Sequence, residues 1–298
     1  MSEHRVIGVD LGGTKILAAT VGADGRIGAR AEIPTPVESQ DALLEGIATA
    51  VEKVGGDFAA LGLGVPSILD RRTGAVLGSV NIPLEGVRLG DVLEERFGVP
   101  VAVENDANVA TLAEWRLGAG RGVDDLVMLT LGTGVGGGVV TGGSLFRGWA
   151  ELGHVVVVPD GPRCQGVCTG RGHLEAVASG NAGDRAAEEI WGEGANAELL
   201  VGRAGEGDEE ALSALAQIGH LLGLAVGSFA NVFGAELVVV GGGFGVAAAE
   251  FLFPSALEAA RREALPPAAD LRIATAELGG DAGAIGAGLL ALEALGEA

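Results

Sequence analysis

The fold is decided by residues 5–21, RVIGVDLGGTKILAATV, in which two apolar, β-branched runs flank the glycine turn LGGTK. The turn is too short for a helical crossover, so residues 5–10 and 16–21 are predicted to form a hairpin. The same arrangement recurs in residues 126–143, where the predicted strand LVMLTLG, the turn TGVGGG and the returning strand VVTGG follow one another. We interpret this recurrence as an internal duplication that produces two related lobes.

Strands and helices alternate along the rest of the chain. The first hairpin continues into a three-stranded meander, and a helix is predicted over residues 39–54. A strand ending in VAVEN leads into a predicted helix over about 105–118. Further helical stretches are expected near 181–203, 208–230 and 246–263, and a final helix from Ala282 onward. This alternation predicts an α/β fold.

Composition excludes several classes of protein. The 298 residues include 40 acidic and 19 basic side chains, so the net charge is -21. Such a surface repels phosphate backbones and anionic lipids, which argues against nucleic-acid and membrane partners. A hydrophobic content of 48% excludes a disordered chain. The N-terminus lacks the layout of a signal peptide and only two cysteines occur, so we expect a cytoplasmic protein.

Two glycine turns are candidate phosphate loops. The first places the carboxylate of Asp10 at a strand end, where it could bind hydrated Mg²⁺, beside backbone N–H groups that glycine leaves accessible. Alone it could equally be a simple hairpin turn. A second turn with Thr133 and Gly134 favours a nucleotide, because two loops can hold a polyphosphate from both sides. The residues predicted to bind nucleotide in the two turns are Asp10, Gly12, Gly13, Thr14, Lys15, Thr133 and Gly134.

Two familiar nucleotide motifs do not fit. The P-loop pattern needs Gly-Lys-Ser/Thr, whereas this chain has Gly13, Thr14 and Lys15 in that order. The pattern G-x-G-x-x-G occurs at residues 132–137 but is expected to continue as a strand instead of opening a helix. The segment GGGFG, which includes Gly242, does lead into a predicted helix. Gly242 could contact a nucleotide or could merely allow tight packing between the strand and the helix.

The segment VENDANVA, residues 103–110, lies where a strand meets a helix. Asp106 could simply stabilise the helix N-terminus, or it could accept a proton from a hydroxyl nucleophile. Asn105 would then orient the same substrate. Strand alternation predicts that Glu104 points to the opposite side, so Glu104 is set aside.

Four nitrogen and sulfur ligands cluster in the segment 151–175. His154, Cys164, Cys168 and His173 have spacings of ten, four and five positions, which suit a tetrahedral zinc site. The alternative is a pair of free thiols with two surface histidines. Zinc would order this glycine-rich segment and fix Glu151 and Glu175 toward a ligand. Two carboxylates and an imidazole suit a polyhydroxylated ligand.

These motifs resemble the ROK family of sugar kinases and repressors. The resemblance rests on VDLGGTKI (9–16), ENDANVA (104–110), LGTGVGGG (131–138), ELGH (151–154), the cysteine segment through Gly180, VVGGGF (239–244) and DAGAIGAG (281–288). It implies a two-lobed, actin-like ATPase fold related to ribonuclease H. We expect a small lobe of residues 1–114 plus about 282–298, a large lobe of residues 115–281, and ligands between the lobes.

The resemblance also implies roles for single residues. Asp106 would be the base for the 6-hydroxyl of a hexose, and Asn105, Glu151, His154 and Glu175 would bind its other hydroxyls. His154 would place one ring nitrogen on zinc and the other toward the sugar.

The chain departs from the family pattern in two places. Three residues separate its cysteines, with His173 where the last cysteine of C-x-C-G-x-x-G-C is expected. Ser67 ends the segment that is usually G-x-P-G.

The expected activity is ATP- and Mg²⁺-dependent phosphorylation of a hexose, most simply glucose. A kinase for mannose, fructose, N-acetylglucosamine or N-acetylmannosamine is the first alternative, and a non-catalytic sugar sensor is the second. A nucleotide-dependent oxidoreductase is favoured only by the glycine spacing. Repressors of the family carry an N-terminal helix-turn-helix, whereas Asp10 lies at the start of this chain. The family suggests a homodimer.

Overall fold

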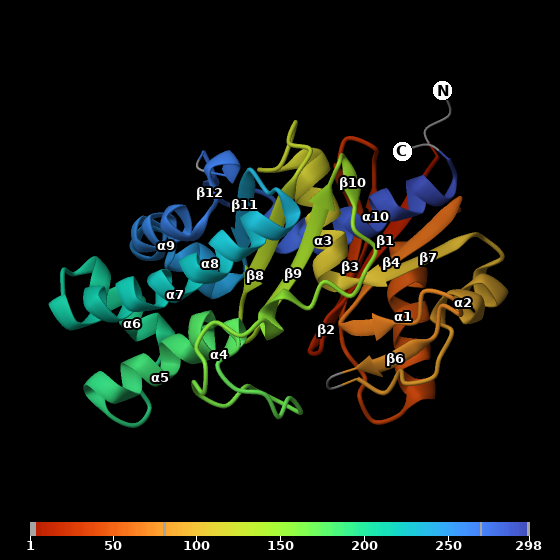
Figure 1. Cartoon of the computed structure of the whole chain (residues 1–298). Helices are drawn as coiled ribbons and strands as arrows, with labels where there is room; N and C mark the ends of the chain where they lie inside the picture. The colour runs from red at the N-terminus through yellow and green to blue at the C-terminus, as the bar shows by residue number, and fades with distance from the viewer. Residues whose placement is uncertain (1–3, 80–81, 269, 297–298) are drawn as a thin grey trace. The chain divides into compact units, whose positions relative to one another are not determined.

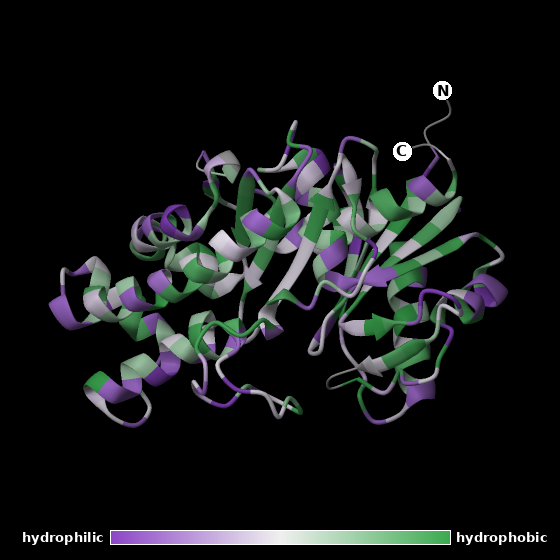
Figure 2. Ribbon diagram, in the orientation of Figure 1, coloured by the Kyte–Doolittle hydropathy of each residue, from purple (hydrophilic) through white to green (hydrophobic). Residues whose placement is uncertain are grey.

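A computed structural model of the chain describes residues 4–79, 82–268 and 270–296. The chain divides into two compact units (Figure 1). The first unit contains Met1–Gly118 and Gly280–Ala298, and the second unit contains Ala119–Gly279. In both units the strands are largely hydrophobic (Figure 2), so each sheet forms the centre of its own core.

The first unit is built on a five-stranded sheet of order β3-β2-β1-β4-β7. The meander expected from the sequence is present: β1 (Val6–Leu11), β2 (Lys15–Val21) and β3 (Ile27–Pro34) pair antiparallel. The strands β4 (Ala60–Val65) and β7 (Val101–Asn105) run parallel to β1. The register aligns Asp10 with Gly64 and Gly64 with Glu104. The carboxyl ends of three strands therefore bring the first glycine turn and the ENDANVA segment to one edge of the sheet.

Four helices and a hairpin complete the first unit. The predicted helices are confirmed as α1 (Gln40–Val54), capped by the Ser39 side chain, and α3 (Asp106–Leu117). The helix predicted from Ala282 is confirmed as α10 (Ala282–Ala294). Sequence patterns did not predict the short helix α2 (Leu89–Phe97) or the hairpin β5 (Ser67–Leu69) and β6 (Val76–Ser79).

Helix α10 packs so closely against the sheet that the two backbones come into contact. A Cβ added to Gly8 would lie 2.0 Å from the Ala284 carbonyl oxygen, and one added to Gly62 would lie 1.8 Å from that of Ala287. On the other side of the helix, a Cβ on Gly286 would lie 1.7 Å from the Val109 carbonyl oxygen of α3. The small residues of the DAGAIGAG segment therefore let α10 fit between the sheet and α3.

The second unit repeats the sheet of the first. Its order is β10-β9-β8-β11-β12, with β8 (Leu126–Leu131), β9 (Val135–Thr141) and β10 (Ser144–Leu145) antiparallel. The strands β11 (Leu237–Gly241) and β12 (Arg272–Thr275) are parallel to β8. A glycine turn joins the first two strands of both sheets, so the predicted duplication is confirmed. The G-x-G-x-x-G segment continues as β9, as expected.

The helices of the second unit partly match the prediction. The stretch 181–203 is two helices, α5 (Gly180–Trp191) and α6 (Ala197–Gly205), because Gly192 and Gly194 adopt positive φ angles and Asn196 caps α6. The other helices are α4 (Leu174–Ala178), α7 (Glu209–Phe233), α8 (Gly243–Ala247) and α9 (Ala249–Glu263). Helix α7 is long and apolar enough to span a membrane, but its apolar residues contribute to the core of this unit.

Candidate functional site

Hydrogen bonds to Lys15 and to Thr35, the residue after β3, fix the first glycine turn. The backbone N–H of Gly12 donates to the Lys15 carbonyl oxygen at 2.9 Å, and the Thr35 hydroxyl donates to the Gly12 carbonyl oxygen at 2.7 Å. The Thr35 N–H donates to the Thr14 carbonyl oxygen at 3.0 Å. Gly13 and Thr14 are exposed, and a Cβ on Gly13 would meet open space. The turn is thus fixed at its base and accessible at its tip.

Asp10 is enclosed between this turn and the start of α10. A Cβ on Gly283 would lie 2.5 Å from the Asp10 Cγ, so only glycine fits opposite the carboxylate. Burial raises the pKa of Asp10, and the positive charge of Lys15 opposes this shift. The Lys15 Nζ itself lies 2.9 Å from the Glu32 Oε2 on β3 and is exposed. Asp10 is therefore a desolvated carboxylate that a divalent cation would stabilise.

Asn105 and Asp106 form the start of α3. The Asn105 Oδ1 caps the helix by accepting from the backbone N–H groups of Ala107 at 2.9 Å and Asn108 at 3.2 Å. Its Nδ2 has no hydrogen-bond partner among the described residues and can donate to a ligand. Asp106 is the first residue of the helix and is half-buried. Asp106 therefore lies where it can stabilise the N-terminus of α3, and its role as a base stays a prediction.

Glu104, which strand alternation set aside, is paired with Arg71, a residue that no sequence pattern singled out. Glu104 is fully buried and accepts hydrogen bonds from Arg71, from the Asn105 N–H at 2.8 Å and from the Asn108 Nδ2 at 3.1 Å. Burial opposes ionisation of Glu104, but these hydrogen bonds and the charge of Arg71 outweigh it and lower its pKa. A charged residue directly after the apolar run Val101–Val103 of β7 was the signal that could have indicated a buried partner.

The second glycine turn is supported by Glu175 and by the start of α5. The Glu175 Oε2 accepts from the Val135 N–H at 3.0 Å, and a Cβ on Gly134 would lie 2.3 Å from the same oxygen. The Gly180 N–H donates to the Gly132 carbonyl oxygen at 2.7 Å. Thr133 is exposed at the tip of the turn. Glu175, predicted to bind substrate, thus also positions the predicted phosphate loop.

Gly242 is the residue before α8 and lies against the end of β8. Its φ angle is 81°, and a Cβ there would lie 2.4 Å from the Leu131 carbonyl oxygen. The positive φ angle and the close contact with the Leu131 carbonyl oxygen both require glycine at this position. Gly242 therefore lies next to the second glycine turn, which starts at Gly132.

The four predicted zinc ligands converge. One ligand atom from each of His154, Cys164, Cys168 and His173 lies within 4.8 Å of the others. The two Nδ1 atoms are 3.3 Å apart, Cys164 Sγ is 3.6 Å from the His154 Nδ1, and Cys168 Sγ is 3.6 Å from the His173 Nδ1. Tetrahedral zinc with usual bond lengths needs about 3.4 Å between two nitrogens and about 3.6 Å between nitrogen and sulfur. The residues fit a zinc ion, and zinc binding stays a prediction.

Two other predicted sugar ligands, Glu151 and Glu175, lie near His154 of this cluster. The Cys164 Sγ lies 3.6 Å from the Glu175 Oε1. Glu151 precedes a short 3₁₀ turn, Leu152–His154, and is exposed. Desolvation by the surrounding protein nevertheless raises the pKa of Glu151. The nearby His154 opposes this shift, and the charge of Glu175 adds to it. Because Nδ1 of His154 faces the cluster, its Nε2 is the nitrogen left for a ligand.

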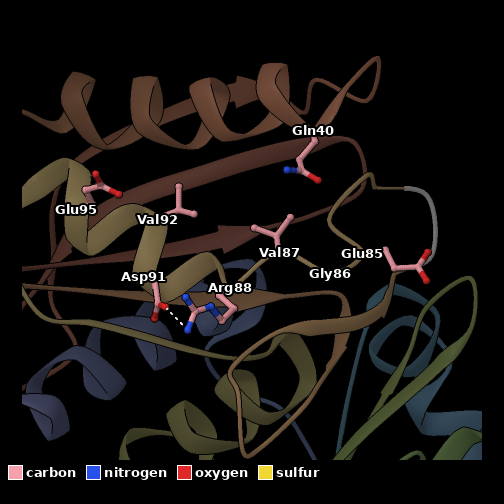
Figure 3. A pocket seen from close by; sticks show the side chains of 8 residues that line it. All are labelled: Gln40, Glu85, Gly86, Val87, Arg88, Asp91, Val92 and Glu95. Atoms are coloured by element: carbon pink, nitrogen blue, oxygen red, sulfur yellow. Dashed lines mark ion pairs between the residues drawn. The ribbon is translucent and has the colours of Figure 1, made fainter.

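A separate surface pocket of about 430 Å³ in the first unit contains none of the predicted site residues (Figure 3). Gln40, at the start of α1, and residues at the start of α2 line it. Arg88 is paired with Asp91 at 2.9 Å, which leaves Glu85 and Glu95 as its other charges. An open pocket with this acidic lining does not suit a nucleotide phosphate.

Comparison with known proteins gives one consistent family. Residues 6–294 match the ROK family. The chain is 39% identical to the glucokinase of Thermotoga maritima over 99% of this chain and 100% of that protein. It is 37% identical to the glucokinase of Halalkalibacterium halodurans over 97% and 96%. The structure of a ROK family glucokinase from Streptomyces griseus in complex with glucose and AMPPNP matches with a TM-score of 0.82 and 34% identity, covering 97% of this chain and 99% of that one. The predicted actin-like ATPase fold is confirmed.

Proposed function

Because this chain belongs to the ROK family, we propose that it transfers the γ-phosphoryl group of ATP to the 6-hydroxyl of glucose in the cytoplasm. The observation that carries this proposal is the 37–39% identity with bacterial glucokinases over nearly the whole chain. The bound glucose and AMPPNP of the Streptomyces griseus relative support glucose as acceptor and ATP as donor.

The first unit supplies the proposed base. Asp106 accepts the proton of the 6-hydroxyl while that oxygen forms a bond to the γ-phosphorus, and the bond to the β-phosphate oxygen breaks to release ADP. The Nδ2 of Asn105 donates to the same sugar, since its Oδ1 is engaged in the helix cap. Asp10 would hold hydrated Mg²⁺, which would neutralise phosphate charge. The N–H groups of Gly13 and Thr14 and the side chain of Lys15 receive the phosphates, whereas the Gly12 N–H, bound to the Lys15 carbonyl oxygen, fixes the base of the turn.

The second unit supplies further sugar and nucleotide contacts. Glu151, His154 and Glu175 accept or donate hydrogen bonds at the other sugar hydroxyls. Thr133 and Gly134 contact phosphate, and the backbone of Gly242, beside the second glycine turn, contacts the nucleotide. A zinc ion held by Cys164, Cys168, His173 and the Nδ1 of His154 would order this segment. The short distance between Cys164 and Glu175 supports such a coupling of metal and sugar ligands.

The test is ADP release with Mg²⁺ and ATP across glucose, mannose, fructose, N-acetylglucosamine and N-acetylmannosamine, and with polyphosphate as an alternative donor. Strong preference for glucose supports the proposal. Preference for another sugar would replace the substrate, and sugar binding without turnover would favour a sensor.

The Asp106→Asn variant tests the base. We expect kcat to fall at least about a hundredfold, because the amide cannot accept the proton, while calorimetry finds glucose affinity largely retained. Asp41→Asn, the same change in the first turn of α1, is the matched control and should keep wild-type turnover. Near wild-type kcat in Asp106→Asn would remove this residue from its role.

A further inference from the structure

The buried Glu104 and the partly exposed Arg71 form a two-pronged ion pair in the first unit. The Arg71 Nη1 lies 2.6 Å from the Glu104 Oε2, and the Nη2 lies 2.7 Å from the Oε1. Glu104 has no exposed surface, whereas the Arg71 side chain is 33% exposed. Two parallel N–H to oxygen bonds fix both the distance and the plane of the carboxylate.

The pair connects two elements that are distant in the sequence. Arg71 projects from the turn between β5 and β6, which Asp70 stabilises by accepting from the Arg72 N–H at 2.8 Å and from the Gly74 N–H at 2.8 Å. Glu104 is near the end of β7, two residues before Asp106. The arginine therefore starts from a fixed turn and reaches the strand end that carries the proposed base.

Glu104 also holds the residues on either side of Asp106. Its Oε1 accepts from the backbone N–H of Asn105 and from the side chain of Asn108, one residue before and two residues after Asp106. The first turn of α3 is thus bound to a carboxylate whose own orientation is set by Arg71. A shift of the pair would move the backbone of Asp106.

Stability alone does not account for such a pair. Burying the Glu104 carboxylate is costly, and replacing a buried ion pair by apolar residues is often neutral or stabilising. Orientation, in contrast, has a large effect near reacting atoms, where a displacement of about 1 Å reduces turnover by about a hundredfold. The position of the pair beside Asp106 therefore points to a role in catalysis.

We propose that Arg71 and Glu104 are positioning residues for phosphoryl transfer, which set the orientation of Asp106 through Asn105 and Asn108. This inference rests on the proposed function. Neither residue contacts substrate in this proposal. Their effect is exerted through the start of α3, so it should appear in kcat more than in glucose affinity.

The experiment compares Arg71→Gln, Glu104→Gln and the double variant with wild-type protein. We measure kcat at saturating glucose and ATP, glucose affinity by calorimetry without ATP, and the melting temperature. We expect each single variant to lose at least about tenfold in kcat and to lose less than about threefold in glucose affinity. The double variant should lose no more than the worse single variant, because both changes break one interaction.

Two further variants distinguish positioning from folding. Arg71→Lys keeps the positive charge but cannot make the two parallel hydrogen bonds of the guanidinium group. It should therefore recover part of the kcat lost in Arg71→Gln. Arg96→Gln is the matched control, because Arg96 also pairs with two glutamates, Glu45 and Glu52, but on the exposed surface of α1 and α2. It should keep wild-type kcat. If Arg71→Gln does not fold, Arg71→Lys is compared with wild type instead, and wild-type kcat in Arg71→Lys would overturn the inference.

Wild-type kcat in folded Arg71→Gln or in folded Glu104→Gln, with only a lower melting temperature, would overturn the inference. So would multiplicative losses in the double variant. A wild-type protein without kinase activity would instead overturn the proposed function.

Discussion

The substitution Gly62→Ala tests the close approach between β4 and α10. A Cβ at residue 62 would lie 1.8 Å from the Ala287 carbonyl oxygen, and ordinary contacts of a Cβ begin at 3.4 Å. Strand and helix would have to separate by about 1.6 Å, the difference between these two distances. The backbone angle of Gly62 itself suits alanine, so the clash is the whole perturbation.

The expected loss follows from the side chains that α10 buries. Ile285, Leu289, Leu290 and Leu292 are all buried, and burial of each contributes about 2 kcal/mol. A gap of about 1 Å removes up to about half of the dispersion contacts across it. Losing about a third of the burial free energy of these four side chains lowers the free energy of unfolding by about 3 kcal/mol.

Hydrogen exchange measured by mass spectrometry is the suitable assay, because it reports the opening free energy of the first unit separately from the second. Peptides from β1, β4 and α10 should lose about 3 kcal/mol of protection in Gly62→Ala, and peptides from residues 119–279 should not change. Gly78→Ala is the matched control, since Gly78 is also a strand glycine but has open space around its Cα. A loss below about 1 kcal/mol in Gly62→Ala would refute the reasoning.

Two further predictions concern charge and metal. In Glu104→Gln the protein loses a carboxylate whose pKa in the folded chain lies below 4.5. The stability that this group contributes is fully present above its ordinary pKa of 4.5 and is lost as the pH falls below that value through the lowered folded pKa. The difference in urea midpoint between wild type and variant should therefore stay constant from about pH 7 to about pH 5 and shrink at more acidic pH. A difference that is independent of pH throughout would contradict this. Protein purified without chelator should contain about one zinc per chain by elemental analysis, and His173→Ala should lose it whereas His220→Ala, outside the cluster, should not. Less than about half an equivalent in wild type would contradict the zinc site.

Local patterns predicted much of the fold. The run RVIGVDLGGTKILAATV is a hairpin because glycines interrupt two β-branched segments, and its recurrence at 126–143 identified the duplicated sheet. The cysteine segment was informative for a similar reason: four histidine and cysteine ligands within twenty residues do converge. Such features depend on neighbours in the sequence, so they can be read from one chain.

Contacts between distant segments could not be predicted in this way. Arg71 and Glu104 are 33 residues apart, and strand alternation assigned Glu104 a side of the sheet without indicating its partner. The stretch near 181–203 was predicted only as helical, whereas Gly192 ends α5 and Asn196 starts α6. The sequence did not indicate that the glycines of β1 and β4 lie against α10, because this contact depends on how the sheet and the helix are placed in the fold.

The discontinuous first unit has a consequence for synthesis on the ribosome. Its sheet is complete once β7 has emerged, but its covering helix α10 follows only after the whole second unit, residues 119–279. At about 5 to 20 residues per second, those residues take about 10 to 30 s to translate. During that interval the apolar strip around Gly8 and Gly62 is without its helix, and the second unit can fold first. The first unit, although most of it is made first, is therefore expected to be the last part to reach its native state.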